Sequence, residues 1–381
     1  MYACSRCGEC VDECPVYQET GNKYEAPGYK IKALRPVVSR RILPFFLGSA
    51  PSEEELKRVA DGLYGCTLCG RCVSVCPYHY DLVDLWETSR ESAIRNGLGP
   101  APILEMIQIT LAEKNFLKRP YAARKNWTKG ENIPIGKKAD TVYFVGCVMS
   151  YTPTLRSAAR SAGTILNAAG ENWTILEDEW CCGVPLKFGG GTEKFREFVE
   201  HNVAAIEATG ANKVISSCPG CYRMIKQEYP KALGRPLKFS VIHMTELVDE
   251  YAKSGKVSFS GKLEAGLTYH DPCELSRLLG IVDAPRNVFS RIATKFAELP
   301  ENRYNTHCCG GGGLYKAMNT EMSLNIAQKR IGQAENLGAE IMAAACPACF
   351  MNLSQAARFK KSGVKVLDFA EIVAQQIQTK Q

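Results

Sequence analysis

The chain has 381 residues, of which 45% are hydrophobic and 23% are charged, and its formal net charge is +7. This length allows two or three domains with a substantial core. No uninterrupted apolar run reaches the roughly 18 residues of a membrane-spanning helix, and the start, MYACSRCGEC, has no apolar stretch of the signal-peptide type. We therefore expect an intracellular protein with reduced thiols. Because this count treats every cysteine as neutral, the net charge is not evidence for a nucleic-acid partner, and we expect none.

The unusual number in the composition is the eighteen cysteines. In a small secreted chain they would indicate a disulfide framework. The length of this chain, the missing signal peptide and the many C-x-x-C steps argue against that alternative. In a reducing compartment such steps are typical of metal sites.

Two cysteine runs open the chain. Each has the spacing C-x2-C-x2-C-x3-C-P, the first from Cys4 to Pro15 and the second from Cys66 to Pro77. This is the bacterial-ferredoxin spacing, in which the fourth cysteine of each run ligates the other cluster. A zinc site is the alternative, but zinc needs only four ligands and has no use for the third step. The spacing predicts two cubane [4Fe–4S] clusters, one held by Cys4, Cys7, Cys10 and Cys76 and the other by Cys66, Cys69, Cys72 and Cys14.

The insert between the two runs is predicted to be helical. Ser52 to Glu55 has the pattern of a helix-start capping box, and residues 81–96 are a second predicted helix. We expect residues 1–100 to form a mostly helical ferredoxin-type domain that relays electrons singly. Residues 101–138 are expected to link it to the rest of the chain.

From Thr141 onward, short apolar segments alternate with helical ones. TVYFVGC is predicted as a buried strand ending at Cys147, and helices are predicted over 153–169 and 192–209. KVISS is a short strand before Cys218, and FSVIHM precedes a helix that starts at Thr245. Strands that alternate with helices indicate a parallel sheet with helices on its faces.

The next segments repeat this order. LTYHDPC ends at Cys273, helical segments are predicted over 284–297 and 319–337, and EIMAAAC and VKVLDF precede a terminal helix. Corresponding cysteines are 126 residues apart for Cys147 and Cys273, and 128 apart for Cys218 and Cys346. We therefore predict an α+β multidomain chain, in which the helical module precedes two duplicated α/β domains with parallel sheets, over residues 139–255 and 262–381.

Each duplicated unit carries five cysteines, spaced C-x33-CC-x35-CxxC in the first and C-x34-CC-x36-CxxC in the second. With DPC, CPGC and CPAC, this layout resembles the D subunit of heterodisulfide reductase over nearly the whole chain. The two units look like the CCG-type cysteine-rich domains of that family. Relatives with the same layout are the DsrK-type subunits of sulfate reducers and the C subunits of anaerobic glycerol-3-phosphate and glycolate dehydrogenases.

The resemblance implies a cofactor for each half. In this family five cysteines, including an adjacent pair, hold a noncubane [4Fe–4S] cluster. Carried over by position, the first cluster is held by Cys147, Cys181, Cys182, Cys218 and Cys221. The second is held by Cys273, Cys308, Cys309, Cys346 and Cys349. With the two cubanes, these sets use all eighteen cysteines.

The resemblance also implies an activity. A disulfide would be cleaved between the two noncubane clusters, each binding one sulfur and receiving one electron from the cubanes. The substrate is expected to be a heterodisulfide such as coenzyme M–coenzyme B, or a disulfide or trisulfide on a carrier protein, and the reverse thiol oxidation fits equally. The alternative is an electron-relay subunit of a membrane-linked anaerobic dehydrogenase complex; both five-cysteine sets are intact, which favours the reductase.

Two histidines lie beside these cysteines in the sequence. His270 precedes Cys273 by three residues and His307 directly precedes Cys308. A proton-donor role is one interpretation, because imidazole titrates near neutral pH. Packing or a hydrogen bond that supports a ligand is the interpretation we favour. Lys187 and Lys316 follow the two cysteine pairs and are weak candidates for attracting an anionic thiol substrate.

An electron donor is required, because the chain has no flavin or pyridine-nucleotide motif. Subunits of this layout commonly bind a membrane cytochrome b-type protein, and a flavoprotein is the other expected donor. The expected location is therefore cytoplasmic, with a peripheral position on the cytoplasmic face of the membrane.

Overall fold

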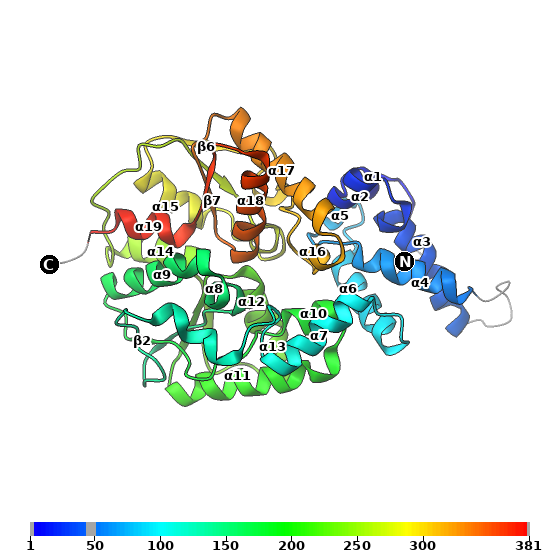
Figure 1. Ribbon diagram of the computed structural model, residues 1–381, viewed down its shortest axis with the longest axis horizontal. Helices are drawn as coiled ribbons and strands as arrows, with labels where there is room; N and C mark the ends of the chain where they lie inside the picture. The colour runs from blue at the N-terminus through cyan, green and yellow to red at the C-terminus, as the bar shows by residue number, and fades with distance from the viewer. Residues whose placement is uncertain (1–3, 43–50, 379–381) are drawn as a thin grey trace.

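The computed structural model of the chain describes residues 4–42 and 51–378. A group of N-terminal helices, blue to cyan in Figure 1, lies beside two sheet-containing halves. The first half, green, lies below the second half, which runs from yellow to red. Each half has one four-stranded parallel sheet. The predicted fold class, a helical module followed by two parallel-sheet units, is confirmed.

The N-terminal helices begin where the sequence signals predict. Ser52 and Glu55 form the capping box of α4: the Ser52 hydroxyl accepts from the Glu55 N–H at 3.2 Å, and the Glu55 carboxylate accepts from the Ser52 N–H at 2.9 Å. Asp81 caps α6 by accepting from the Asp84 N–H. The helices are α1 (Glu9–Asp12), α2 (Pro15–Thr20), α3 (Pro27–Ile42), α4 (Glu53–Tyr64), α5 (Arg71–Ser74), α6 (Leu82–Arg95) and α7 (Ala101–Glu113).

The sheet of the first half has the strand order β2–β1–β3–β4. Val142, Val214 and Ile215 are fully buried, as expected for parallel strands covered on both faces. The strands are β1 (Thr141–Tyr143), β2 (Trp173–Thr174), β3 (Lys213–Ser216) and β4 (Ser240–His243). The helices are α8 (Cys147–Tyr151), α9 (Arg156–Ala168), α10 (Val184–Gly189), α11 (Phe195–Thr209), α12 (Pro219–Arg223), α13 (Tyr229–Leu233) and α14 (Met244–Ser254).

The strand predicted up to Cys147 ends earlier, at Tyr143. Beyond the strand, two backbone N–H groups donate to a side chain instead of to a neighbouring strand. The buried Glu179 carboxylate accepts from the Val145 N–H at 2.8 Å and from the Gly146 N–H at 2.9 Å. Gly146 then adopts a positive φ of 78°, which suits glycine. The chain leaves the sheet here, and Cys147 becomes the first residue of α8 beyond the strand end.

The sheet of the second half repeats this order as β6–β5–β7–β8. Its strands are β5 (Leu267–His270), β6 (Phe296–Glu298), β7 (Ile341–Ala344) and β8 (Lys365–Asp368). Its helices are α15 (Ala284–Ile292), α16 (Tyr315–Met318), α17 (Thr320–Asn336), α18 (Pro347–Lys360) and α19 (Phe369–Gln376).

One element of the second half differs from its prediction. The helix expected over 284–297 ends at Ile292, and Phe296–Glu298 form the edge strand β6. Leu267 of β5 pairs with Phe296, and Tyr269 pairs with Glu298. Pairing with a neighbouring strand therefore overrides the local helical pattern, and it completes the correspondence with β2 of the first half.

The two halves share one hydrophobic core. α9 of the first half packs against α19 of the second, and α14 packs against α15. Ala158, Leu247, Val288 and Val373, which come from these four helices, are all buried in the same cluster. The halves are thus held as a pair, with their cysteine-bearing strand ends at a fixed separation.

The segment 101–138, expected to link the first two domains, covers part of the first half. α7 packs against α10, and the 3₁₀ turn η2 (Tyr121–Thr128) packs against α8. Ile103 and Trp127 are buried in these contacts. The domain limits 1–100, 101–138, 139–255 and 262–381 remain our prediction.

Candidate functional site

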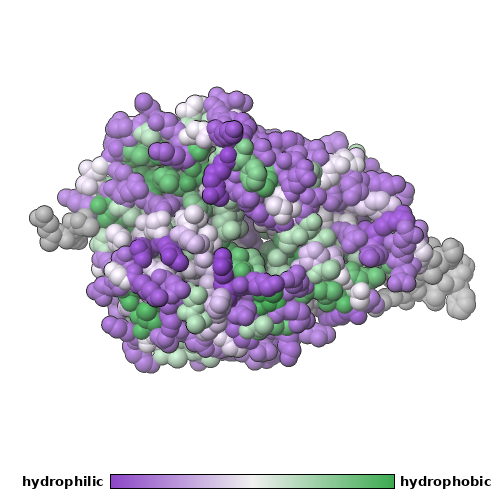
Figure 2. Space-filling view, viewed as in Figure 1, coloured by the Kyte–Doolittle hydropathy of each residue, from purple (hydrophilic) through white to green (hydrophobic). Residues whose placement is uncertain are grey.

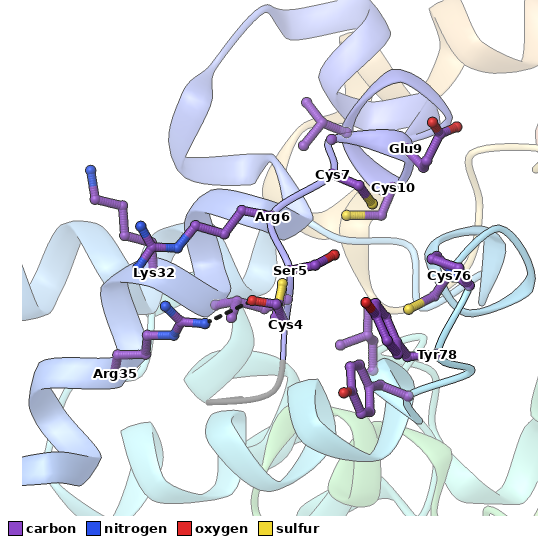
Figure 3. A pocket seen from close by; sticks show the side chains of 17 residues that line it. Cys4, Ser5, Arg6, Cys7, Glu9, Cys10, Lys32, Arg35, Cys76 and Tyr78 are labelled. Carbon is purple, nitrogen blue, oxygen red and sulfur yellow. Dashed lines mark hydrogen bonds between the residues drawn. The ribbon is translucent and has the colours of Figure 1, made fainter.

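The structure groups the first cysteine set around one cavity near the N-terminal end. Cys4, Cys7, Cys10 and Cys76 line a space of about 160 Å³ (Figure 3). Cys76 reaches this set from the second run, as the spacing rule predicts. The Arg35 guanidinium donates to the Cys4 carbonyl at 3.3 Å, and Figure 3 shows Arg6, Lys32 and Arg35 together on the α3 side. Cys7 is exposed, so this cavity lies at the surface.

The second set is deeper. Cys14, Cys66, Cys69 and Cys72 line a smaller cavity of about 20 Å³ with Trp86. Burial raises the pKa of the Cys14 thiol to about 11 and that of Cys72 well above its ordinary value. Pro15 begins α2 directly after Cys14, where a proline needs no N–H partner. The crossed grouping of the two runs is therefore present in the fold.

A buried guanidinium lies beside the second set. Arg90 of α6 is 0% exposed and donates to the carbonyls of Leu63, Cys66, Phe188 and Gly313 at 2.8–3.1 Å. Phe188 belongs to the first half and Gly313 to the second. Arg90 therefore joins all three parts of the molecule at the edge of the second cysteine set.

The five predicted ligands of the first half form a row at the carboxyl end of its sheet. Cys147 lies beside Cys181, and Cys182 lies between Cys181 and Cys221. Cys221 in turn contacts Cys218. Hydrogen bonding to Cys181, together with burial, raises the pKa of Cys147 well above its ordinary value.

The second half repeats the row in the same order. Cys273 lies beside Cys308, Cys309 lies between Cys308 and Cys349, and Cys349 contacts Cys346. The sulfur atoms of Cys309 and Cys349 are 3.1 Å apart. One difference between the sets is that Cys273 and Cys308 also pack against Cys69 of the N-terminal module. The second-half row therefore touches the deeper N-terminal cysteine set directly.

A cleft of about 490 Å³ lies between the halves. Figure 2 shows it as a hollow with hydrophobic residues along its edge. All five cysteines of the first-half row line it, together with Cys346 of the second-half row. Its apolar residues include Met106, Phe116, Val184, Phe188, Leu314 and Met351.

Charged side chains are few in this cleft. The lining contains Lys118, Lys316 and Glu274. Lys316 donates to the amide oxygens of Asn352 at 2.8 Å and Gln355 at 2.6 Å, and burial lowers its pKa. Burial raises the pKa of the Glu274 carboxyl. Lys187 is not among the lining residues, and its ammonium lies 3.4 Å from the Glu228 carboxylate.

Neither of the two predicted histidines lines this cleft. His270 is fully buried, and one of its ring nitrogens lies within 4.8 Å of the sulfurs of Cys309 and Cys349. The Arg330 guanidinium donates to its Nδ1 at 3.4 Å, which places the imidazole proton on Nε2. Burial lowers the pKa of His270 to about 3. His307 pairs with Glu301, and burial lowers its pKa. A proton-donor role for either remains a prediction.

The cysteines fit iron–sulfur clusters by their chemistry. All eighteen lie in the described part of the chain and none forms a disulfide. They gather into sets of four, four, five and five, and thiolates are the usual ligands of such clusters. His270 lies beside two cysteines of the second-half set, and its buried Nε2 has no hydrogen-bond partner among the described residues, as expected where a further acceptor belongs.

Sequence reasoning missed several buried charges around the cysteine sets. Arg124 contacts both Glu179 and the sulfur of Cys147. Arg223 of α12 lies 2.9 Å from Glu87 of α6 and 3.5 Å from Glu274. Glu179 stands two residues before the first adjacent cysteine pair, so its place in the motif was a usable signal. Nothing in the spacing indicates Arg124, Arg90 or Arg223, because their partners come from distant segments.

Comparison with known families agrees with this layout. Residues 1–80 match the family described as a 4Fe-4S dicluster domain, and residues 141–226 and 267–354 each match the family described as a cysteine-rich domain. The chain is thus an iron–sulfur protein with one dicluster module and two cysteine-rich domains.

Curated relatives give the family. The D subunit of the dihydromethanophenazine:CoB–CoM heterodisulfide reductase of Methanosarcina acetivorans is 35% identical over 98% of this chain and 93% of the relative. The B subunit of the fumarate reductase (CoM/CoB) of Methanothermobacter marburgensis is 26% identical over 98% of this chain and 72% of the relative. This chain belongs to the family of heterodisulfide reductase D subunits and is an iron–sulfur oxidoreductase.

A solved structure shares the fold. The crystal structure of a hypothetical protein from Helicobacter pylori matches with a TM-score of 0.56 at 13% identity, over 98% of this chain and 72% of that one. Within residues 4–42 and 51–378, no helix combines the length and the apolar character needed to cross a membrane.

Proposed function

We propose that the chain is the catalytic subunit of a disulfide reductase, with its substrate bound in the cleft between the halves. The observation that carries this proposal is the lining of the cleft. It exposes the whole first-half cysteine row and Cys346 of the second row to one apolar space. The reaction consumes two electrons and two protons, RSSR′ + 2e⁻ + 2H⁺ → RSH + R′SH, and its reverse is thiol oxidation.

The cofactors we propose are two cubane and two noncubane [4Fe–4S] clusters on the ligand sets predicted from the sequence. Clusters held by the two five-cysteine sets would supply the two electrons singly. Around them, the apolar lining of the cleft excludes water from the substrate. Among the described residues, the Lys316 ammonium hydrogen-bonds to two amide oxygens and to no carboxylate, so it suits an anionic group of the substrate.

The substrate we favour is a heterodisulfide. The Methanosarcina acetivorans relative is named for the CoB–CoM heterodisulfide, and 35% identity makes that compound the first to test. A disulfide or trisulfide on a carrier protein is the other substrate of the same chemistry. The electron donor is proposed to be a partner protein, either a membrane cytochrome b-type protein or a flavoprotein, at the cytoplasmic face of a membrane.

The test is an anaerobic assay with reduced viologen as the electron donor. Disulfides, including coenzyme M–coenzyme B, are added one at a time, and the loss of viologen colour is recorded. We expect rapid colour loss with at least one disulfide, abolished in Cys182→Ser and Cys309→Ser. Protein with its full iron content that oxidises viologen with none of the small disulfides would leave the carrier-protein substrate or the electron-relay role.

Two lysines provide a matched pair for substrate charge. We predict that Lys316→Met raises the KM for an anionic disulfide such as dithiodiglycolate about tenfold, while kcat and the KM for neutral bis(2-hydroxyethyl) disulfide change little. Lys187→Met is the control, because Lys187 follows the other cysteine pair but is paired with Glu228 outside the cleft lining. Equal effects of both substitutions on the anionic substrate would contradict a charge contact at Lys316.

A further inference from the structure

The two five-cysteine rows are repeats, but a segment outside the repeats covers only one of them. Lys114 accepts from the Cys181 N–H at 2.9 Å through its carbonyl, and η2 packs against α8, the helix that Cys147 begins. The segment before the second half takes another course. Ser260 bonds to Gln376, and Leu263 bonds to Ile292, away from the second-half cysteines. The first row therefore has neighbours that the second lacks.

The most direct of these neighbours is Arg124 of η2. Its Nη2 lies 3.3 Å from the Cys147 sulfur and 3.2 Å from the Lys114 carbonyl, and its Nη1 donates to the Glu179 carboxylate at 2.6 Å. Glu179 is itself fixed by the N–H groups of Val145 and Gly146. Because backbone N–H groups hold both carboxylate oxygens, Glu179 fixes Nη1 of the guanidinium, while Nη2 contacts both the Lys114 carbonyl and the Cys147 sulfur.

This ion pair lies inside the protein. Arg124 is 5% exposed and Glu179 3% exposed. The guanidinium pairs with the Glu179 carboxylate at 2.6 Å. A charge at this depth is weakly screened by solvent and salt.

The second row has no equivalent contact. Among residues 4–42 and 51–378, no arginine or lysine donates to a sulfur of Cys273, Cys308, Cys309, Cys346 or Cys349. The Gly310 N–H donates to Cys308, and Arg330 donates to the His270 ring instead of a sulfur. The halves therefore differ in direct contact: a guanidinium hydrogen-bonds to a sulfur in the first row, whereas Lys316 and Arg330 interact with Cys309 of the second row electrostatically, without such a bond.

We propose that Arg124 is a positioning residue for the first-half cysteine site, where its guanidinium, in hydrogen-bond contact with the Cys147 sulfur, stabilises the additional negative charge of the reduced site. The inference rests on the proposed cluster at that site. Each electron taken up adds one negative charge, so a fixed positive charge in hydrogen-bond contact favours the reduced state. Arg124 thereby makes the first-half site, which faces the cleft, easier to reduce than the same cysteines without it.

The test is a redox titration of the anaerobically purified full-length protein, followed by electron paramagnetic resonance. Reduced viologen supplies electrons, one for each one-electron reduction of the protein. At a fixed potential we expect Arg124→Gln to lower the ratio of reduced to oxidised first-half site about tenfold, a shift of about 59 mV to lower potential. Only one noncubane signal should move, and the other serves as an internal standard.

Three further variants separate charge from packing. Arg124→Lys keeps the charge and should shift the midpoint less than Arg124→Gln. Glu179→Gln removes the nearby negative charge and should shift the midpoint in the opposite direction, upward. Arg160→Gln is the matched control, because Arg160 bonds to the Trp127 and Lys129 carbonyls and contacts no sulfur; no shift is expected there.

Iron content, measured for every variant, shows whether the clusters are assembled. Should Arg124→Gln not assemble its first-half site, the upward shift in Glu179→Gln decides the proposal. Equal shifts in Arg124→Gln and Arg124→Lys, movement of both signals together, or a downward shift in Glu179→Gln would overturn it. None of these measurements uses a disulfide, so a failure of the proposed reaction would leave them unaffected.

Discussion

At the residue scale, buried charges decide how the parts of this molecule meet. Arg90 shows this most clearly, because its five hydrogen bonds reach carbonyls of the N-terminal module and of both halves. Burying a guanidinium is unfavourable unless its donors are satisfied. Here carbonyls from three parts of the chain satisfy the donors together, so Arg90 links the assembly of those parts to the neighbourhood of Cys66.

Removing Arg90 should therefore loosen the whole molecule. Arg90→Met keeps much of the volume but leaves the four carbonyls without a donor, and we expect a loss of roughly 3–5 kcal/mol in the free energy of unfolding. Anaerobic scanning calorimetry would record a lower Tm. Arg95→Met is the control, because Arg95 lies on the same helix, is 60% exposed and pairs only with Glu91; its expected effect is below about 0.5 kcal/mol. Equal decreases in Tm for both variants would refute the role of Arg90 in holding the three parts of the molecule together.

The environment of Asp368 predicts that the stability of the fold depends on pH, and this prediction does not involve the cysteines. This residue caps α19 through the Ala370 N–H, its second carboxylate oxygen has no partner, and burial raises its pKa to about 7. The pKa of an aspartate in the unfolded chain is about 3.9. Between the unfolded and the folded pKa, Asp368 therefore binds a proton in the folded state that it does not bind in the unfolded state. The resulting stabilisation is complete below about pH 4 and is lost as the pH rises through about 7.

Asp368→Asn keeps the capping oxygen and removes the titration. The difference between the Tm of the variant and the Tm of the wild type should therefore increase, in favour of the variant, from pH 5 to pH 8. Melting curves at four pH values would measure this gain. Parallel curves for the two proteins would show that Asp368 does not titrate in this range.

At the element scale, the sequence signals that act locally were the dependable ones. Ser52 caps α4 as predicted, the helix expected over 81–96 is α6, Leu82–Arg95, and the helix expected over 319–337 is α17, Thr320–Asn336. The end of β1 and the strand β6 could not be predicted in this way. Glu179 takes the N–H groups that would have extended β1, and β5 recruits Phe296–Glu298, and both partners are distant in sequence.

The candidate site likewise combines features that the sequence predicts with features that depend on tertiary packing. Cysteine spacing predicted the two four-cysteine sets, and the family resemblance implied the two five-cysteine sets; the structure brings the members of each set together, and their role as cluster ligands remains a prediction. The cleft, the contact of Cys69 with Cys308 and the pairing of Arg124 with Glu179 depend on how the three parts pack. Lys187 and Lys316 were equivalent in the sequence, and only the fold separates them.

The glycines after the cysteine pairs serve contacts between these elements. A Cβ at Gly313 would lie 2.4 Å from the Thr67 carbonyl carbon and 2.6 Å from the Cys66 carbonyl oxygen. Gly313→Ala should therefore separate the loop from the N-terminal module and lower the Tm and the iron content. Gly338→Ala is the matched control, because Gly338 also has a positive φ but its Cβ would meet nothing within 4 Å. The control should lose only about 1–2 kcal/mol in the free energy of unfolding, because alanine is strained in the left-handed backbone conformation. Similar losses in both variants would exclude the contact of the Gly313 loop with the N-terminal module as the cause.

At the scale of the whole molecule, the three parts form one path toward the cleft. The surface set with Cys7 lies at one end, and the deeper set with Cys69 contacts Cys308 of the second half. The first-half row lines the cleft. This order is the one that the proposed disulfide reductase requires, with electrons entering at the helical end and used between the halves.

The measurement that tests this account most directly is a single turnover of the isolated protein. The chain is reduced anaerobically, freed of reductant, and mixed with coenzyme M–coenzyme B in the absence of any partner protein. The account predicts that the protein loses two electrons for each disulfide cleaved and that two thiols appear. Protein that stays reduced and forms no thiol with this disulfide or with a carrier-protein disulfide, yet is reoxidised by a quinone analogue or a flavoprotein, would contradict it and favour the electron-relay role.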